Sequence, residues 1–536
     1  MKKAKLLTLS LLLVCSVLFA SCTPKAENSK PSQTNAGVPY PAEEAPSVDG
    51  AVYEPEMFAD QSVPYYDSEE YGEFSESRFL DPEDNPLSTF SIDVDTASYS
   101  NIRRYLNDGQ LPPADAVRAE ECINYFSYDY PRPGGEHPVA VDVVISDCPW
   151  NSGNLLARVA VQAEALDLSD VPPSNLVFLL DVSGSMDAPD KLPLLVSGIK
   201  MLTGMLGKND TVSIVVYAGA AGTVLEGVPG DEEQQIKNAL DRLSAGGSTA
   251  GGEGIERAYK LAEEYFIEGG NNRVILCTDG DFNVGVSSEE GLESLIEKKR
   301  KSGIFLSVLG FGTGNIKDNK METLADKGNG NYAYIDSLME AKKVLVNEMS
   351  GTLFTVAKDV KIQVEFNPAM VAKYRLVGYD NRRLRDEDFN DDRKDAGEMG
   401  AGHTVTVFYE ITPASAAASG VDDLRYQSGE HAAPEDFGDG EWMWVKLRYK
   451  EPDSDESQRM DLYVDSGAYT DDPDDDFLFA SSVAEYALLL KDSEYKADAD
   501  FDSLIERARE SRGADPEGYR SQFIQLAEMA QILYGD

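Results

Sequence analysis

Five oxygen-bearing residues in the middle of the chain have the types and the order of a site for a hard divalent cation. Asp181, Ser183 and Ser185 alternate in the segment Asp-Val-Ser-Gly-Ser. Thr249 follows in a glycine-rich segment, and Asp279 comes after an apolar run. Carboxylate and hydroxyl oxygens suit Mg²⁺, Mn²⁺ or Ca²⁺, whereas zinc in proteins prefers nitrogen and sulfur ligands. We therefore predict that these five residues bind Mg²⁺, with Mn²⁺ or Ca²⁺ as alternatives.

The predicted ligands lie where predicted strands end. The apolar run Leu176–Leu180 is typical of a strand buried on both faces, and Asp181 follows it directly. Asp279 comes two residues after the apolar run 274–277. Ligands of parallel sheets bind beyond the carboxyl ends of the strands. Ser and Asp at helix starts also serve as caps, but the order of the later Thr and Asp favours a metal site.

Residues 174–350, which we call the inserted domain, alternate between strand and helix patterns. A helix is predicted where Leu195, Ile199, Leu202 and Leu206 recur with helical spacing. Further strands are predicted at 212–217, 274–277, 304–309 and 332–335, and further helices at 233–243, 254–266, 289–301, 320–327 and 338–349. This alternation predicts an α/β fold with a mainly parallel sheet and helices on both faces.

Strand patterns dominate on both sides of the inserted domain. They are predicted at 88–94, 139–145 and 155–163 before it, and at 361–366, 374–377, 404–410, 442–449 and 462–464 after it. Neither flank alone has enough strands to bury two sheets. We therefore predict one β-sandwich into which the inserted domain is placed, because insertion is tolerated where the ends of a domain lie close together.

The division of the chain that follows from these patterns has six parts. They are a signal peptide (1–21), a disordered tether (22–75), an α+β region (76–173), the inserted domain (174–350), a β-rich region that completes the sandwich (351–468) and a C-terminal helical region (469–536).

The N-terminus predicts export and a lipid anchor. Three lysines among the first five residues precede the short apolar run Leu6–Ala20, which is typical of a signal peptide. The segment Phe-Ala-Ser-Cys that ends at Cys22 resembles a bacterial lipobox. The alternatives are a plain secretory signal with an incidental cysteine, or an uncleaved anchor. We predict lipidation at Cys22 and a place in the cell envelope, held to a membrane outside the cytoplasm.

Composition excludes some classes of partner. The 536 residues carry a formal net charge of -47, which repels nucleic acid and anionic lipid headgroups, so the lipid anchor is the only membrane contact predicted. Beyond Cys15 and Cys22, the cysteines are Cys122, Cys148 and Cys277. An odd number without Cys-x-x-Cys spacing indicates neither a zinc site nor a disulfide framework, and a Cys122–Cys148 bridge is not favoured.

Together, the five predicted ligands resemble the metal-ion-dependent adhesion site of the von Willebrand factor A family, whose domains have a Rossmann-like fold. That site reads Asp-x-Ser-x-Ser, then a distant Thr and a distant Asp, and all five positions are filled here. The resemblance implies that Ser183 and Ser185, with either Thr249 or Asp279, bind the ion directly. It also implies that a Glu or Asp of a protein partner takes the sixth position.

The rest of the chain is similar to a bacterial family of von Willebrand A lipoproteins. The matching segments are 85–99 and 118–126 in the N-terminal region, and 479–490 and 518–520 in the C-terminal region. This resemblance implies a mode of binding and does not name a partner. Asp93 and Asp95, in the first of these segments, are a candidate second metal pair, although acids at a strand end or helix cap are the favoured interpretation.

Three functions remain, of which a binding module is favoured. It recognises an acidic side chain of a partner protein through the ion, at the cell surface. A scaffold whose metal site only stabilises the fold is the second. A metal-dependent hydrolase is disfavoured, since His137, His403 and His431 form no ligand motif and no base accompanies the serines. We therefore predict that the chain is not an enzyme.

Overall fold

The computed structural model describes most of the chain beyond the predicted tether. The described residues are 69–166, 171–218, 220–246, 251–280, 289–348, 351, 353–416, 440–452 and 454–535. They belong to one compact unit, Ser62–Asp536. The predicted signal peptide, Cys22 and most of the predicted tether lie outside the described residues. Within the described ranges, no helix has the length and hydropathy needed to cross a bilayer.

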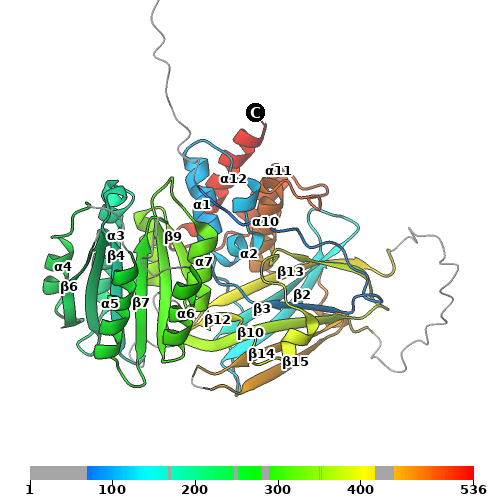
Figure 1. The fold of residues 1–536 in the computed structure, drawn as a ribbon. Coiled ribbons are helices and arrows are strands. Elements are labelled where there is room, and N and C mark those ends of the chain that lie inside the picture. The colour runs from blue at the N-terminus through cyan, green and yellow to red at the C-terminus, as the bar shows by residue number, and fades with distance from the viewer. Residues whose placement is uncertain are drawn as a thin grey trace, which may run out of the picture. The chain divides into compact units, whose positions relative to one another are not determined.

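A six-stranded sheet forms the centre of the inserted domain, in the order β6-β5-β4-β7-β8-β9 (Figure 1). Its strands are β4 (Ser174–Asp181), β5 (Thr211–Ala218), β6 (Ala220–Pro229), β7 (Asn271–Thr278), β8 (Ile304–Phe311) and β9 (Tyr332–Ile335). Neighbours pair in parallel except β5 and β6, which are antiparallel. Every residue of the central strand β4 is buried, which explains its uninterrupted apolar sequence.

Helices cover both faces of this sheet. On one face, Val177 and Leu179 of β4 share a hydrophobic cluster with α5 (Gly251–Glu264), α6 (Glu289–Arg300) and α7 (Asp318–Lys327). On the other face lie α3 (Leu192–Leu202), α4 (Glu233–Leu240), α8 (Leu338–Lys342) and the π turn η4 (Lys343–Asn347). The predicted α/β layering is therefore confirmed.

The flanking segments combine into one β-sandwich, as predicted. One sheet has the order β11-β13-β3-β2, and the other has the order β1-β10-β14-β15 with β12 paired to β10. The strands are β1 (Leu87–Ser91), β2 (Val139–Asp147), β3 (Leu155–Ala163), β10 (Thr355–Phe366), β11 (Val371–Val377), β12 (Gly397–Gly400), β13 (Thr404–Pro413), β14 (Met443–Lys450) and β15 (Ser457–Val464). Strands from before and after the inserted domain pair directly, β3 with β13 and β1 with β10. The fold class is thus confirmed, whereas the domain boundaries stay a prediction.

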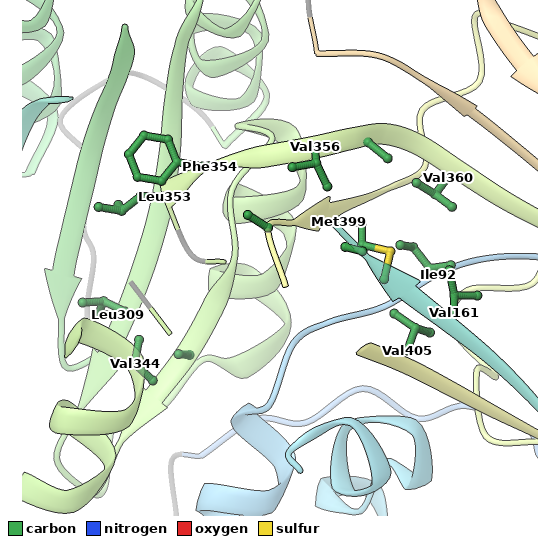
Figure 2. Close-up of a cluster of buried hydrophobic side chains, with 14 of the residues drawn as sticks. Ile92, Val161, Leu309, Val344, Leu353, Phe354, Val356, Val360, Met399 and Val405 are labelled. Carbon is green, nitrogen blue, oxygen red and sulfur yellow. The ribbon is translucent and has the colours of Figure 1, made fainter. Parts of the chain in front are cut away.

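The chain enters and leaves the inserted domain at the same place. The backbone N–H of Gly402 donates to the carbonyl of Glu164 on the way in, and the N–H of Ala401 donates to that of Phe354 on the way out, each at 2.8 Å. Figure 2 shows apolar side chains of both parts meeting there, with Leu309 and Val344 on one side and Val356 and others on the other. The junction is therefore packed rather than a loose linker.

Five helices pack together beside the outer face of the four-stranded sheet. They are α1 (Ala97–Asn107), α2 (Ala119–Asn124), α10 (Asp475–Leu490), α11 (Phe501–Glu510) and α12 (Tyr519–Gly535) (Figure 1). Their apolar side chains cluster with Leu156, Ala160 and Phe408, which point out of the sandwich, and α1 also contacts β9 of the inserted domain. The predicted C-terminal helical region therefore completes a third layer. Cys122, Cys148 and Cys277 are buried free thiols, so Cys122 and Cys148 form no bridge.

Candidate metal-binding site

Two acidic residues lie side by side at the carboxyl ends of neighbouring parallel strands. Asp181 is the last residue of β4, and Asp279 follows the last residue of β7. Leu180 pairs with Cys277, so the two strands end together. Both carboxylates are buried, with 0% and 1% of Asp181 and Asp279 exposed. The parallel topology therefore brings together two acids that are far apart in the sequence.

The loop after β4 adds two hydroxyls. Oδ1 of Asp181 accepts a hydrogen bond from the backbone N–H of Ser183 at 2.8 Å. The Oγ atoms of Ser183 and Ser185 lie 2.9 Å apart. Ser183 is buried, whereas Ser185 is exposed at the start of the short helix η2 (Gly184–Asp187). The site thus runs from a buried carboxylate to an exposed hydroxyl.

These atoms fit a hard divalent ion. Oδ2 of Asp181 is buried and accepts no hydrogen bond of ordinary geometry among the described residues, although the hydroxyl of Tyr217 lies close enough to lower the pKa of this carboxyl. Burial raises the pKa of Asp181 to about 6, against the hydrogen bonds from Ser183, and the charge of Asp279 adds to the rise. Adjacent oxygens at about 2.1 Å from an octahedral Mg²⁺ are about 3.0 Å apart, and the Oγ atoms of Ser183 and Ser185 lie 2.9 Å apart. A divalent cation at this position would offset the negative charge of the buried Asp181 carboxylate.

Thr249, the fifth predicted ligand, lies outside the described residues. The described residues on either side of it belong to the surroundings of the site. The N–H of Gly246 donates to the carbonyl of Val182 at 2.8 Å. Helix α5 begins at Gly251, and a Cβ atom on Gly254 would lie 3.2 Å from Leu179 of β4.

A buried lysine at the site was not predicted. Nζ of Lys191, at the N-cap of α3, donates to Oδ2 of Asp279 at 2.8 Å. Only 5% of Lys191 is exposed. Nothing in the local pattern marks this residue, because its partner is 88 positions away. The available signal in the sequence was a lysine that follows several acids in the loop after a buried strand.

Asp93 and Asp95 bind an arginine, which supports the interpretation that they are structural. The Arg382 guanidinium donates to Asp93 at 3.0 Å and to Asp95 at 3.2 Å. Among the described residues, Asp93, Glu121 and Glu322 are close enough to hold one metal ion. Arg382 and Arg118 already supply positive charge to these three acids.

The inserted domain has the fold of a von Willebrand factor type A domain. The family model described as "von Willebrand factor type A domain" matches residues 175–348, and one described as "von Willebrand factor" matches 65–158. A third, for the C-terminal part of the uncharacterized protein YfbK, matches 351–533. The chain is 44% identical to YfbK of Escherichia coli K12 over 467 residues, which cover 86% of this chain and 80% of YfbK. The chain therefore belongs to the family of YfbK.

The chain also has a low overall similarity to solved structures. A von Willebrand factor type A protein from Catenulispora acidiphila is 14% identical, with a TM-score of 0.41 over 76% of this chain and 99% of that chain. Proximal thread matrix protein 1 from the mussel byssus, solved with a zinc-occupied adhesion motif, is 23% identical with a TM-score of 0.29. It covers 35% of this chain and 46% of that chain.

Proposed function

We propose that this protein is a cell-surface lipoprotein that binds a protein partner through a divalent cation. Asp181, Ser183, Ser185, Thr249 and Asp279 hold the ion, and a Glu or Asp of the partner completes its coordination. The observation that carries the proposal is the pair of buried carboxylates, Asp181 and Asp279, at the carboxyl ends of two neighbouring parallel strands. Two hydroxyls at the right separation lead from Asp181 to the surface.

The chemistry of the residues supports Mg²⁺ or Mn²⁺ as the ion. When bound, such an ion supplies a positive charge that attracts an outside carboxylate. Ser183 and Ser185 are neutral donors, so they leave most of that charge available. Asp181 orients the loop, since its Oδ1 atom already fixes the backbone of Ser183. We expect weak binding of the ion without a partner, because few charged ligands reach it directly.

A binding role agrees with the class of the domain. Von Willebrand A domains generally bind a metal at this motif and mediate protein–protein interactions, and their relatives are generally adhesion or scaffold proteins without catalytic activity. A purely structural metal site is the competing function. Capture of a partner separates the two, because a structural site predicts no partner that depends on the ion.

The proposal is tested by crosslinking and capture on whole cells. We expect the wild type to capture a partner in Mg²⁺, to lose it in excess chelator and to regain it when Mg²⁺ is restored. Asp181→Ala removes the buried carboxylate and should abolish capture and most of the divalent-ion affinity measured by calorimetry. Glu256→Ala removes an exposed acid of α5 and serves as the matched control. Capture that persists in chelator, or equal ion affinity of wild type and Asp181→Ala, would rule the proposal out.

The lipid anchor is a separate part of the proposal. Its support is the lipobox-like sequence that ends at Cys22, after a basic and then an apolar segment. We expect Cys22→Ala to block incorporation of a labelled fatty acid and to release the protein from the membrane fraction. A Cys22→Ala protein that is still processed and membrane-bound would show that the anchor is something else.

A further inference from the structure

We propose that Lys191 holds the affinity of the free protein for the divalent ion low, so that the ion is retained firmly only when a partner carboxylate is present. This inference rests on the proposed function of the same site. Nothing in the adhesion-site motif includes a lysine. The inference comes from where the structure places this one.

The ion pair between Lys191 and Asp279 is buried and direct. Nζ of Lys191 lies 2.8 Å from Oδ2 of Asp279, and the two side chains are 6% and 0% exposed. Asp279 is one of the two buried acids at the strand ends. Its negative charge is therefore already compensated by an ammonium group before any metal ion arrives.

The fold makes room for this lysine. The side chain of Lys191 passes over Gly312, directly after β8. A Cβ atom on Gly312 would lie 2.2 Å from Cε and 2.3 Å from Cγ of Lys191. Gly312 also has a φ of 72°, in the left-handed region that favours glycine. Lys191 thus packs against a glycine, at a position where any larger residue would collide with its side chain.

The position of the charge predicts its effect. The ammonium group of Lys191, beside Asp279, repels a nearby divalent cation. This repulsion is strong because both charges are buried away from water. Because Asp279 is already paired with Lys191, its carboxylate also neutralises less of the positive charge of a bound ion. The ion is then held weakly by the free protein but remains more attractive to an outside carboxylate. Partner and ion therefore bind with positive coupling, each raising the affinity for the other.

The test is a calorimetric titration of Mn²⁺ into the whole protein and its variants. Lys191→Met keeps the length and the packing of the side chain but removes the charge, and we expect it to bind Mn²⁺ about tenfold or more tightly. Lys191→Arg keeps the charge and should stay near the wild type. Lys200→Met removes a partly exposed lysine of the same helix, which pairs with Asp241, and should not change the affinity.

Thermal unfolding supplies a second readout. Lys191→Met leaves Asp279 buried without its cation, so the metal-free variant should melt at a lower temperature than the wild type. Its melting temperature should rise more on addition of Mn²⁺ than that of the wild type. This gain is measured against the metal-free baseline of each variant, so a destabilised variant is still informative.

The outcomes separate the two proposals. If Asp181→Ala abolishes Mn²⁺ binding while Lys191→Met binds no more tightly than the wild type, the metal site stands and the role of Lys191 is overturned. If Asp181→Ala binds Mn²⁺ as the wild type does, the proposed function fails, and the inference on Lys191 fails with it. Tighter binding by Lys191→Met, with Lys191→Arg and Lys200→Met unchanged, supports the inference.

Discussion

At the scale of single residues, the proposed metal site contains a buried charge that costs free energy of folding when no metal is bound. Asp181 is fully buried, and its Oδ2 atom accepts no hydrogen bond of ordinary geometry among the described residues. Leaving a charged oxygen in this state costs free energy of folding. Such a cost is expected where a side chain is placed for an ion and not for packing.

Asp181→Asn should therefore stabilise the metal-free protein. The amide keeps an oxygen that accepts from the N–H of Ser183 and removes the buried charge. We expect the free energy of unfolding to rise by about 1–3 kcal/mol in excess chelator, measured by urea denaturation. A lower free energy of unfolding would mean that the carboxylate is already compensated in the metal-free state.

At the scale of residues, the sequence allowed prediction of those site residues that lie close to one another along the chain. Asp181, Ser183 and Ser185 could be predicted because a buried strand, a tight loop and a helix follow one another within a few residues. Lys191 could not be predicted as a partner of Asp279, since only the pairing of β4 with β7 brings them together. The binding of ions by all five predicted residues stays a prediction.

At the scale of elements, a buried ion network joins α7 of the inserted domain to the flanking regions. Arg382, in the loop after β11, contacts Glu322 at 2.8 Å and Asp326 at 2.7 Å, and Arg118 contacts Asp318 at 2.7 Å. The acids outnumber the arginines, since Asp93, Asp95 and Glu121 also take part. The position of α7 therefore depends on charges supplied by both flanks.

The network predicts a stability that falls as pH rises from the ordinary glutamate pKa to about 8 and then levels off. Burial raises the pKa of Glu322 to about 7 and that of Glu121 to about 8, against the opposing effect of Arg118 on both. The folded state thus holds protons that the unfolded state has already lost, so stability is lost as these acids ionise. We expect the free energy of unfolding to fall by about 1–2 kcal/mol from about pH 6.5 to about pH 8.

Two glutamate variants test this prediction, one at a buried position and one at a partly exposed position. Glu322→Gln removes one of the buried titrating groups and should flatten the pH dependence. Glu297→Gln removes a partly exposed acid whose pKa Lys327 holds low, and it should leave the slope unchanged. A free energy of unfolding that is constant or rises over this pH range would contradict the account. The charged groups that face Glu322 are Arg118, Arg382, Asp93, Asp318 and Glu121.

Most helices and strands with a strong local sequence pattern could be predicted, whereas strands with a weak pattern were missed. The apolar run of β4 and the helical spacing in α3 were sufficient. Strand β6 was missed because its glycines interrupt the alternation, and it adds an antiparallel edge to the sheet. Strand β12 was missed because Gly-Glu-Met-Gly has no strand pattern of its own, and pairing with β10 creates it.

At the scale of the whole molecule, the sandwich depends on both flanks of the inserted domain. Strand β3 has β13 as a neighbour, so the four-stranded sheet is divided between the two flanks, and the other sheet takes its edge strand β1 from the N-terminal flank. The inserted domain has its own six-stranded sheet, covered by helices on both faces. The two parts should therefore differ in their dependence on the C-terminal half.

A fragment ending at residue 350 tests this difference. It lacks β10 to β15 and the helices α10 to α12. Limited proteolysis of the fragment should degrade residues 69–166 rapidly and leave a resistant core of roughly residues 171–348. The same treatment of the full chain should protect both regions. Equal protection of 69–166 in the fragment would show that this flank folds alone.

The central claim is that the ion lies between the loop after β4 and the segments that carry Thr249 and Asp279. The most direct measurement is a crystal structure of the protein grown with Mn²⁺, with anomalous diffraction to locate the metal. We predict one strong anomalous peak within about 2.5 Å of the Oγ atoms of Ser183 and Ser185, absent from Asp181→Ala crystals. A peak elsewhere, or no peak at saturating Mn²⁺, would contradict the claim.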